Sequence, residues 1–444
     1  MGGTVTALRG AALAWRGDPF VVPPAEALHF ESDAVVALRD GRIQHFGAAR
    51  DVLPALAPDT VITRCDRALI VPGFIDCHVH YPQLPIIGAA GHPLLEWLER
   101  YTFPAELRFA DETYARGIAR LFLDQLARNG TTSAAVFCTV HPQSVDALFA
   151  EAETVGLRIV AGKALMDCNA PPALLDTARR GYDESKALID RWHGRGRLSY
   201  AVTPRFVASS SHAQLEAAAA LWREHPGTLL QSHLAENVDE VALVRRLFPE
   251  CTDYADVLDR FGLLGAGAIH GHGIHLSGRE RSRLADTGTA LAHCPTSNLF
   301  LGSGLFDLRA AKACRPPIRI GLATDVGAGT TFSMLSTMAA ATRIAQLRRQ
   351  PLNPVRALWL ATRGAAQALA LDRYVGDLAP GLDADVAVLD LAATPLLAAR
   401  TAQLDNLEEL LAVLMTLGDD RCVMGTWAAG ERIWTRKHPP CANG

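Results

Sequence analysis

Between about residues 71 and 375 the chain repeats one pattern of hydrophobic and polar positions. A short run of β-branched and apolar residues is followed by a polar turn, and then by a longer Ala-, Leu- and Arg-rich segment with apolar residues at helical spacing. Eight runs have the character of strands: 74–80, 132–139, 158–166, 198–206, 228–234, 266–275, 290–298 and 318–325. Because strands that alternate with helices form parallel sheets, the pattern predicts an α/β fold, a closed (β/α)8 TIM barrel.

The two ends of the chain have a different pattern. Residues 1–70 and 376–444 contain short strand-like runs separated by turn-forming DG and AG pairs. Neither end is long enough to form a comfortable core alone, so both are expected to pack together as one small β-sandwich beside the barrel. The predicted domains are therefore 71–375 for the barrel, with 1–70 and 376–444 as the two parts of the sandwich.

Composition narrows the class of protein. Of 444 residues, 49% are hydrophobic and 20% are charged, which is typical of a globular chain. The balance of 43 basic and 47 acidic residues gives a net charge of −4, which favours neither nucleic acid nor an anionic membrane surface as a partner. No stretch has the composition of a spanning helix, and Arg9 and Arg16 interrupt the apolar residues at the start. We therefore expect a cytoplasmic protein without a secretory signal.

The cysteines indicate a reducing compartment. The nine cysteines are an odd number without a CxxC pair, which is typical of free and mostly buried thiols. Cys77, Cys168 and Cys294 fall near the expected pocket rim, so a metal site containing cysteine has to be considered. The HxE and PCxxC pattern of the zinc deaminases that act on cytidine and nucleic-acid bases does not occur in the chain.

The first candidate for chemistry is the HxH pair, His78 and His80. Both lie in the run FIDCHVH, where the two-residue period of a strand places the two imidazoles on one face. The pair stands at the carboxyl end of the first predicted strand, where barrel enzymes build their active sites. Two imidazoles so placed can share one metal ion.

Four further groups fall at or beside the ends of other predicted strands. His233 ends the fifth strand, His272 lies in the sixth and Asp325 ends the eighth. A single buried histidine is more often structural, but five placements on one rim indicate a shared site. Three imidazoles and a carboxylate suit zinc and leave a position for water, which the metal would convert to hydroxide near neutral pH. Glu236 follows His233 by three residues and either shares the site or favours the dipole of the next helix.

Other polar residues in the strand-like runs are expected to be structural. His270, His275 and His293 are assigned structural or supporting roles around the site. Lys163 lies within the third predicted strand rather than at its tip, and we expect a buried or paired structural lysine.

Several segments, taken in order, resemble the guanine deaminases of the amidohydrolase superfamily. The chain matches them in PGFIDCHVHYPQ, PLLEWLERYTFPAE, NGTTSAAVF, TPRF, QSHLAEN, GHGIHLS, AHCPTSNLFLGSG and GLATDVGAGTTFSM. The resemblance continues to GDLAPGLDADVAVLD near the end of the chain and so covers most of it. The pieces LLEWLERYTFPAE and HVHYPQ separate this group from the rest of the superfamily.

The resemblance implies one zinc ion per subunit, bound by His78, His80, His233 and Asp325. His272 would orient or polarise the hydroxide on that metal. Members with two metals carry a modified lysine at the end of the fourth strand, whereas this chain has TPRF there, so a single metal is implied. The choice between zinc and iron stays open. A homodimer is also implied.

The implied reaction is the hydrolytic deamination of guanine to xanthine and ammonia, without an organic cofactor. Arg205 would face the purine carbonyl, and Gln83 its ring edge. Protons would be relayed through Glu236 and Asp325, with His272 as the third catalytic residue. The residues that would contact the substrate are His80, Tyr81, Pro82, Gln83, Arg205, Phe206, His233, Glu236 and Asp325.

Two other functions remain open at this stage. One is a related deaminase that acts on an oxidised guanine, a thioadenosine-type nucleoside or a pterin. The other is a metal-free scaffold protein, because some relatives of cyclic-amide hydrolases have lost their ligands. This chain retains every ligand position, and the metal content of the purified protein would separate the two classes.

Overall fold

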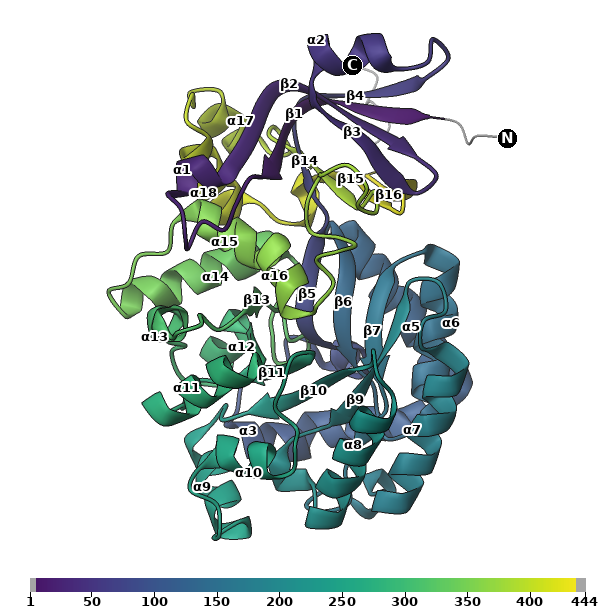
Figure 1. Ribbon diagram of the computed structural model, residues 1–444, viewed down its shortest axis with the longest axis vertical. Helices are drawn as coiled ribbons and strands as arrows, with labels where there is room; N and C mark the ends of the chain where they lie inside the picture. Colours follow the sequence, from purple (N-terminus) through teal and green to yellow (C-terminus); the bar gives the residue numbers. More distant parts are fainter. Residues whose placement is uncertain (1–4, 437–444) are drawn as a thin grey trace.

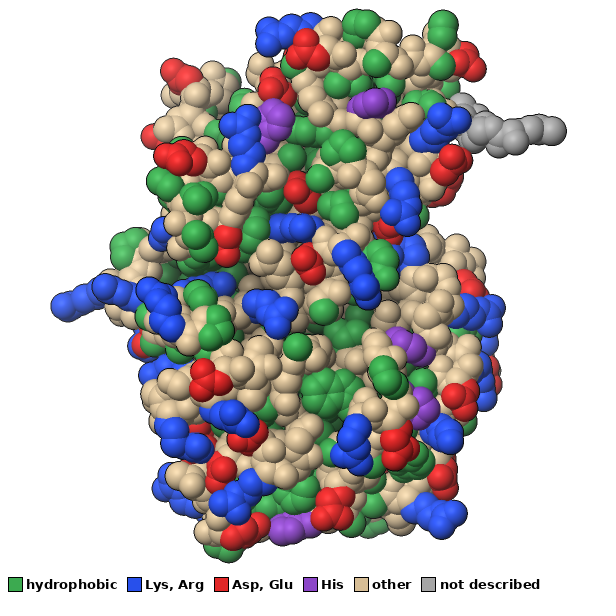
Figure 2. All heavy atoms as spheres, viewed as in Figure 1, with side chains coloured by type: hydrophobic (Ala, Val, Ile, Leu, Met, Phe, Trp, Pro, Cys, Tyr) green, Lys and Arg blue, Asp and Glu red, His purple; other side chains and the backbone are tan. Residues whose placement is uncertain are grey.

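The structure, a computed structural model, describes residues 5–436 and has two parts, a barrel and a smaller sheet above it (Figure 1). Cys441 lies outside the described residues, and the other eight cysteines are free thiols. Acidic and basic side chains are interspersed over the face in Figure 2, as the small net charge leads one to expect. Among residues 5–436, no helix has both the length and the apolar character needed to cross a membrane.

The barrel contains eight parallel strands, as the sequence pattern predicts. Their order in the sheet is their order in the chain. The strands are β5 (Phe74–His80), β6 (Thr131–Phe137), β7 (Arg158–Gly162), β9 (Leu198–Pro204), β10 (Leu229–Leu234), β11 (Ala268–His272), β12 (Ala290–His293) and β13 (Ile320–Leu322). A two-residue strand, β8 (Ala164–Leu165), extends β7 and pairs with β9. The barrel closes through the segment after β13, where Asp325 N donates to His78 O (2.9 Å) and His80 N donates to Val326 O (2.9 Å).

Most of the predicted runs end earlier as strands in the structure; the run 318–325, for example, is a strand only over β13. The runs 158–166, 266–275 and 290–298 end as strands at Gly162, His272 and His293. In the last case Pro295 occupies the first turn of a helix, where the fixed φ of proline is favourable and its missing N–H is no loss. The strand ends therefore lie where the chain turns into the loops of the rim.

Helices surround the barrel, and α16 (Arg363–Ala368) closes the end that faces the small sheet (Figure 1). The outer helices are α5 (Glu112–Arg128), α6 (Pro142–Val155), α7 (Ala178–Trp192), α8 (His212–Glu224), α9 (Val238–Leu247), α10 (Tyr254–Arg260), α11 (Gly278–Thr287), α12 (Pro295–Phe300), α13 (Leu308–Ala313), α14 (Met334–Leu347) and α15 (Pro354–Ala361). Ala365, Ala366 and Leu369, from or just after α16, pack against the small interior residues of the strands. The barrel is thus filled at the end opposite to the site, and only the carboxyl ends of the strands remain open to a ligand.

Short helices connect the first strand to its outer helix. The segment 81–110 contains α3 (Leu94–Trp97) and α4 (Phe103–Leu107), joined by single turns of tighter or wider helix. Although the segment lacks a long periodic helix, it packs into the main core through Trp97 and Phe103. It therefore lies as a folded cover beside the end of β5.

Both ends of the chain contribute to the small β domain, as expected. One continuous sheet of seven strands has the order β16-β15-β14-β4-β1-β2-β3. Its strands are β1 (Thr6–Trp15), β2 (Leu28–Arg39), β3 (Arg42–Ala48), β4 (Val61–Pro72), β14 (Val386–Asp390), β15 (Val423–Ala428) and β16 (Glu431–Thr435). The flanking helices are α1 (Pro24–Ala27), α2 (Ala49–Val52), α17 (Pro395–Thr401) and α18 (Leu407–Leu417). The antiparallel pairing of β14 with β4 joins the two ends of the chain.

Lys163 is a buried and paired lysine, as predicted. Its side chain is fully buried, its ammonium donates to Asp176, and Glu184 lies 3.4 Å away. The pair holds the segment after β8, which contains Asp176, against the junction of β7 and β8. Removal of one member leaves an unpaired charge inside the protein.

We expect Lys163→Met to lower the free energy of unfolding by about 3–5 kcal/mol, because Asp176 would lose its buried partner. The exposed pair Arg179 and Asp183, at 3.5 Å, provides the control. Arg179→Met should change stability by at most about 1 kcal/mol, since water solvates both charges. Thermal denaturation of both variants measures the difference, and equal shifts in Tm would contradict the structural role of Lys163.

Candidate active site

A bulge in β5 turns both histidines of the HxH pair into the barrel. Asp76 is opposite Ala134 of β6 and Val79 is opposite Val136, so the β5 side has one residue more than the β6 side between these pairs. Cys77, within the bulge, packs in the interior layer of the barrel. The extra residue shifts the alternation, and His78 and His80 then face the interior at the rim.

Left-handed backbone conformations orient further residues at the same rim of the barrel. Ala235, His272 and Asp325 have φ values of 48°, 70° and 52°, which are uncommon for residues other than glycine. Ala235 follows β10 directly, His272 ends β11, and Asp325 lies in the segment shortly after β13. Hydrogen bonds hold the turns, because Gly273 N donates to Leu234 O (2.8 Å) and Ile274 N donates to Ala235 O (3.1 Å). Strained backbone of this kind is concentrated at functional sites.

Three imidazoles converge in this interior. His80 Nε2 lies 3.2 Å from His78 Nε2 and 3.2 Å from His233 Nε2. His233 Nδ1 lies 2.6 Å from Arg205 O, so Nδ1 carries the hydrogen that the carbonyl accepts, and Nε2 presents a lone pair to the site. Burial lowers the pKa of His78 to about 4 and also lowers the pKa of His80 and of His233. All three rings are therefore neutral, which is the form that binds metal ions.

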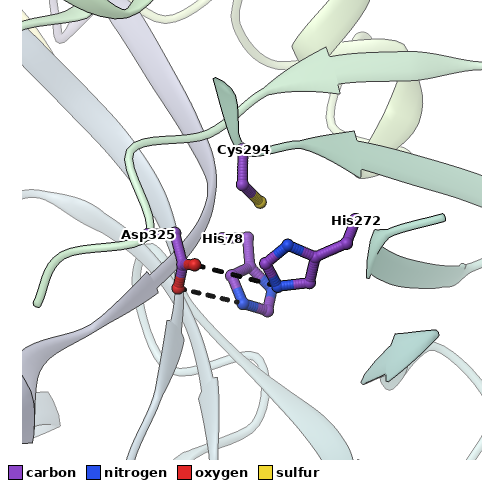
Figure 3. Close-up of side chains that lie close together, drawn as sticks. All are labelled: His78, His272, Cys294 and Asp325. Atoms are coloured by element: carbon purple, nitrogen blue, oxygen red, sulfur yellow. Dashed lines mark ion pairs between the residues drawn. The ribbon is translucent and has the colours of Figure 1, made fainter. Parts of the chain in front are cut away.

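Asp325 faces both His78 and His272 (Figure 3). Asp325 Oδ1 is 3.5 Å from His78 Nε2 and 3.3 Å from His80 Nε2, and Oδ2 is 3.7 Å from His272 Nε2. Burial alone would raise the pKa of Asp325, but the hydrogen bonds of His78 and His80 hold it well below its usual range. The carboxylate is thus ionised in the interior of the barrel.

His272 and Glu236 form a second pair beside the imidazole cluster. His272 Nδ1 lies 2.9 Å from Asn298 Oδ1, and His272 Nε2 lies 3.4 Å from Glu236 Oε2. Burial lowers the pKa of His272, but the carboxylates of Glu236 and Asp325 outweigh it and raise the pKa above its usual value. Burial raises the pKa of Glu236 to about 7, against the opposing charge of His272. Glu236 is therefore placed to hold a proton near neutral pH.

The donor set fits a metal ion. His78, His80 and His233 offer nitrogen atoms within 4.8 Å of one another, and a second group of the same spacing joins His78 with His272, Cys294 and Asp325. Neutral imidazoles and an ionised carboxylate are the ligands that zinc and similar metals take. The Cys294 thiol donates to Ala292 O (3.5 Å), and burial raises its pKa well above the usual value. Cys294 is thus a protonated thiol, which is not the form that binds a metal.

A cavity of about 420 Å³ opens above these groups. Of the residues predicted to contact a substrate, seven line it. The lining residues are His80, Gln83, Leu94, Trp97, Leu98, Arg205, Phe206, His233, Glu236, Glu240, His272, Leu301, Asp325 and Ala328. A lining that combines aromatic and aliphatic side chains with ionisable groups suits a flat, polar-edged heterocycle.

The structure does not bring Tyr81 or Pro82 to this cavity. The Tyr81 ring is fully buried in the core and lies 5.1 Å from the Phe109 ring, and its hydroxyl donates to Ser144 O at 2.6 Å. The physical reason is the alternation after the bulge, which places the residue following His80 on the outer face. The prediction that the Tyr81 side chain contacts a substrate is therefore corrected.

Arg205 has a buried partner that the sequence reasoning missed. Arg205 Nη1 donates to both carboxylate oxygens of Glu106 at 2.8 Å, and the two side chains are 3% and 1% exposed. Glu106 belongs to α4 in the cover segment, which also supplies Leu94, Trp97 and Leu98. All four residues belong to PLLEWLERYTFPAE. The sequence marks this segment as a shared motif, but the spacing of its residues does not show which side chains line a cavity or pair with Arg205.

The remaining histidines occupy structural positions, as expected. The His293 ring stacks on Phe306, with the ring centroids 4.5 Å apart. His275 Nε2 is 2.8 Å from Ser303 O, and Ser303 Oγ donates to Glu236 Oε1 at 3.2 Å. His275 thus supports the loop that positions the Glu236 carboxyl group, and His270 is buried in β11.

Comparison with known proteins assigns the family. The model of the amidohydrolase family matches residues 69–433. The guanine deaminase of Escherichia coli K12 is 46% identical over 93% of this chain and 93% of its own length. A solved structure of E. coli guanine deaminase superposes with a TM-score of 0.94, at 44% identity, over 97% of this chain and all of that one.

A third match is the guanine deaminase of C. acetobutylicum, solved with guanine bound in its active site. It has a TM-score of 0.86 and 28% identity over 97% of this chain and all of that one. The match of the family model over most of the chain agrees with the barrel and with the converging imidazoles at its rim. This chain therefore belongs to the amidohydrolase family.

Proposed function

We propose that this protein catalyses the metal-dependent hydrolytic deamination of guanine to xanthine and ammonia. One observation carries the proposal. Residues that could bind a metal ion, the carboxyl group of Glu236 and the guanidinium of Arg205 all line the same cavity. The strong similarity to proteins named guanine deaminases supports the choice of substrate.

Binding of the base would rest on Arg205, Gln83 and Phe206, which all line the cavity. Arg205 Nη1 is bonded to Glu106, whereas Arg205 Nε and Nη2 have no hydrogen-bond acceptor among the described residues. These donors suit the carbonyl oxygen of guanine, whereas the amino group of adenine would set donor against donor. Gln83 offers both a donor and an acceptor for the ring edge, and Phe206 offers an apolar face.

Proton transfer would begin at Glu236. Burial raises its pKa to about 7, so a proton is available near neutral pH, while Ser303 Oγ donates to Oε1 and Oε2 lies 3.4 Å from His272 Nε2. Glu236 donates its proton to the ring nitrogen beside the amino-bearing carbon, which makes that carbon electrophilic.

Asp325 and His272 would handle the water. A metal held by His78, His80, His233 and Asp325 would supply hydroxide at neutral pH and a positive charge for the developing oxyanion. Asp325 would accept the proton that the attacking water loses, and His272 would stabilise the charge that develops on the new oxygen. Protons relayed through Glu236 and Asp325 then reach the amine, and ammonia leaves as the tetrahedral carbon collapses to xanthine.

The experiment that tests the function is a purine panel with ammonia as the readout. The purified, metal-loaded chain is incubated with guanine, guanosine, adenine, an oxidised guanine and a pterin. We expect ammonia and xanthine from guanine and negligible ammonia from adenine. Rapid release from guanosine or a pterin, with none from guanine, would assign a related deaminase instead. Protein that binds no metal and releases no ammonia would indicate a scaffold.

We expect Arg205→Ala to lower kcat/KM for guanine by about 10–100-fold with little change in metal content, because the carbonyl loses a charged donor. The single variant also leaves the Glu106 carboxylate buried without a partner. The double variant Arg205→Met/Glu106→Gln removes both charges and is the control. If the double variant regains parental kcat/KM, the loss in the single variant comes from the stranded carboxylate and Arg205 does not contact the base.

Several finer points stay predictions. Zinc as the metal, one ion per subunit, a homodimer, a role in purine breakdown and a cytoplasmic location rest on the resemblance and the sequence. Metal analysis of the protein as purified and its mass in solution are the direct measurements.

A further inference from the structure

A second cavity, remote from the candidate active site in the fold, is lined by unpaired cations. It has a volume of about 1040 Å³ and lies between α13, the loop before α15 and the segment that precedes α1. Figure 2 shows Lys and Arg side chains gathered at the left edge of the molecule, near the level of α14 and α15 in Figure 1. The five basic residues that line the cavity are Arg309, Lys312, Arg315, Arg349 and Arg356.

None of these five side chains has a carboxylate within ion-pairing distance among residues 5–436. The carboxylate of the neighbouring Asp307 already has two partners: it forms an ion pair with Arg348 and accepts a hydrogen bond from Gln350 at 3.2 Å. Elsewhere on the outer helices arginines are commonly paired, for example Arg283 with Asp259 at 2.6 Å. Five like charges around one depression repel one another, so an anion that enters it would relieve this repulsion.

Lys312 and Arg356 both lie against the ring of Phe20. The Lys312 ammonium is 4.8 Å from the centre of the Phe20 ring, and the Arg356 guanidinium is 5.3 Å from the same centre. Arg356 Nε donates to Pro19 O at 2.9 Å, which fixes the arginine in place. Burial lowers the pKa of Lys312 to about 8, and the charge of Asp18 opposes this only in part. This is the direction expected for an ammonium without a close counter-ion.

The lining also has an apolar part, formed by Phe20, Leu308, Pro351 and Leu352. A single orthophosphate could meet only some of the five cations around the cavity. A chain of two or three phosphates can span several of them, and an attached organic group can rest on the apolar part. Arginine is suited to phosphate because its planar fork donates two parallel hydrogen bonds.

We propose that this cavity binds a small molecule that carries two or three linked phosphates, such as a nucleoside diphosphate. The proposal is independent of the deamination reaction, since it concerns other residues and is tested by binding.

The probe is ADP, titrated into the full chain by isothermal calorimetry with orthophosphate and adenosine as comparison ligands. ADP carries linked phosphates, orthophosphate carries one, and adenosine carries none. We expect saturable binding of one ADP per chain, weakened by added salt, with orthophosphate at least about 10-fold weaker and adenosine without binding. Equal affinity for orthophosphate and ADP would overturn the assignment to linked phosphates. Binding of adenosine as tight as that of ADP would overturn the role of the cations.

Two matched variants locate the binding. Arg315→Gln/Arg349→Gln removes two exposed cations of the cavity and should weaken ADP binding by about 10-fold or more. Arg245→Gln/Arg246→Gln removes two exposed arginines of α9, which do not line this cavity, and should leave the affinity for ADP unchanged. Both variants should keep parental ammonia release and metal content, which shows that they are folded. Equal weakening in both variants would show that ADP senses only the general charge of the surface and would overturn the site. Tighter binding of a short DNA oligonucleotide than of ADP, lost in the same variant, would assign the surface to nucleic acid instead.

Discussion

Glu236→Gln is expected to lower guanine turnover by about 10²–10⁴-fold while the metal content stays at the parental value. Glutamine has nearly the same shape, so the fold and the hydrogen bond with Ser303 Oγ can persist. An amide has no carboxyl proton to give, and the ring nitrogen of the base would then stay unprotonated when water attacks. Steady-state turnover and metal analysis of the same sample measure the two quantities separately.

The matched control is Asp239→Asn, the same change of carboxylate to amide on an exposed residue of α9. This variant should retain parental turnover. A Glu236→Gln protein that also keeps near-parental turnover would leave Glu236 with only the role of a carboxylate near the start of α9, where it favours the helix dipole.

Asp325→Ala is expected to abolish both metal binding and activity. The carboxylate faces His78 Nε2 and His80 Nε2 at 3.5 and 3.3 Å, so its removal takes the negative ligand from the donor set and the base from the reaction. Loss of a group that merely supports a ligand already costs about 10–100-fold in metal affinity, and loss of the ligand should cost at least as much. Metal per chain after dialysis and ammonia release from guanine are the measurements.

Cys294→Ala distinguishes the two overlapping donor groups. Cys294 lies within 4.8 Å of the ligand atoms of His78, His272 and Asp325, yet its thiol is protonated and donates to a backbone carbonyl. We expect parental metal content and activity for Cys294→Ala, in contrast to Asp325→Ala. The opposite pattern would replace Asp325 by Cys294 in the donor set.

The positions of the metal-type groups could be predicted from the sequence because each follows a recognisable strand. The alternation in FIDCHVH predicts that His78 and His80 share a face, and the ends of the runs place His233 and Asp325 on the same rim. The backbone features that orient these side chains could not be predicted. Neither the bulge in β5 nor the left-handed backbone at His272 and Asp325 has a signal in residue type, since none of these positions is a glycine.

The walls of the cavity were less accessible to sequence reasoning. Leu94, Trp97 and Glu106 lie in a segment of short helices, where neither a two-residue nor a 3.6-residue period persists long enough to show which side chains face inward. Tyr81 was predicted to contact the substrate because His80 and Gln83, its neighbours in the motif, were. Side chains of successive residues point to opposite faces, however, and the Tyr81 ring lies in the core. Pairing between distant segments, such as Arg205 with Glu106, appears only in the folded chain.

The pairing of β4 with β14 has a consequence for synthesis of the protein. Apolar residues of β4, Leu69 and Val71 among them, meet their partners Leu389 and Ala387 only after almost the whole chain has been made. At the usual 5–20 residues per second, this edge of β4 stays uncovered for about 15–60 s on the ribosome. An uncovered apolar edge can pair with other chains, so a message cut short between the barrel and β14 should yield an aggregating product even though the barrel itself is complete. The last strands are thus a requirement for solubility of the nascent chain, and protection by a chaperone matters most during that interval.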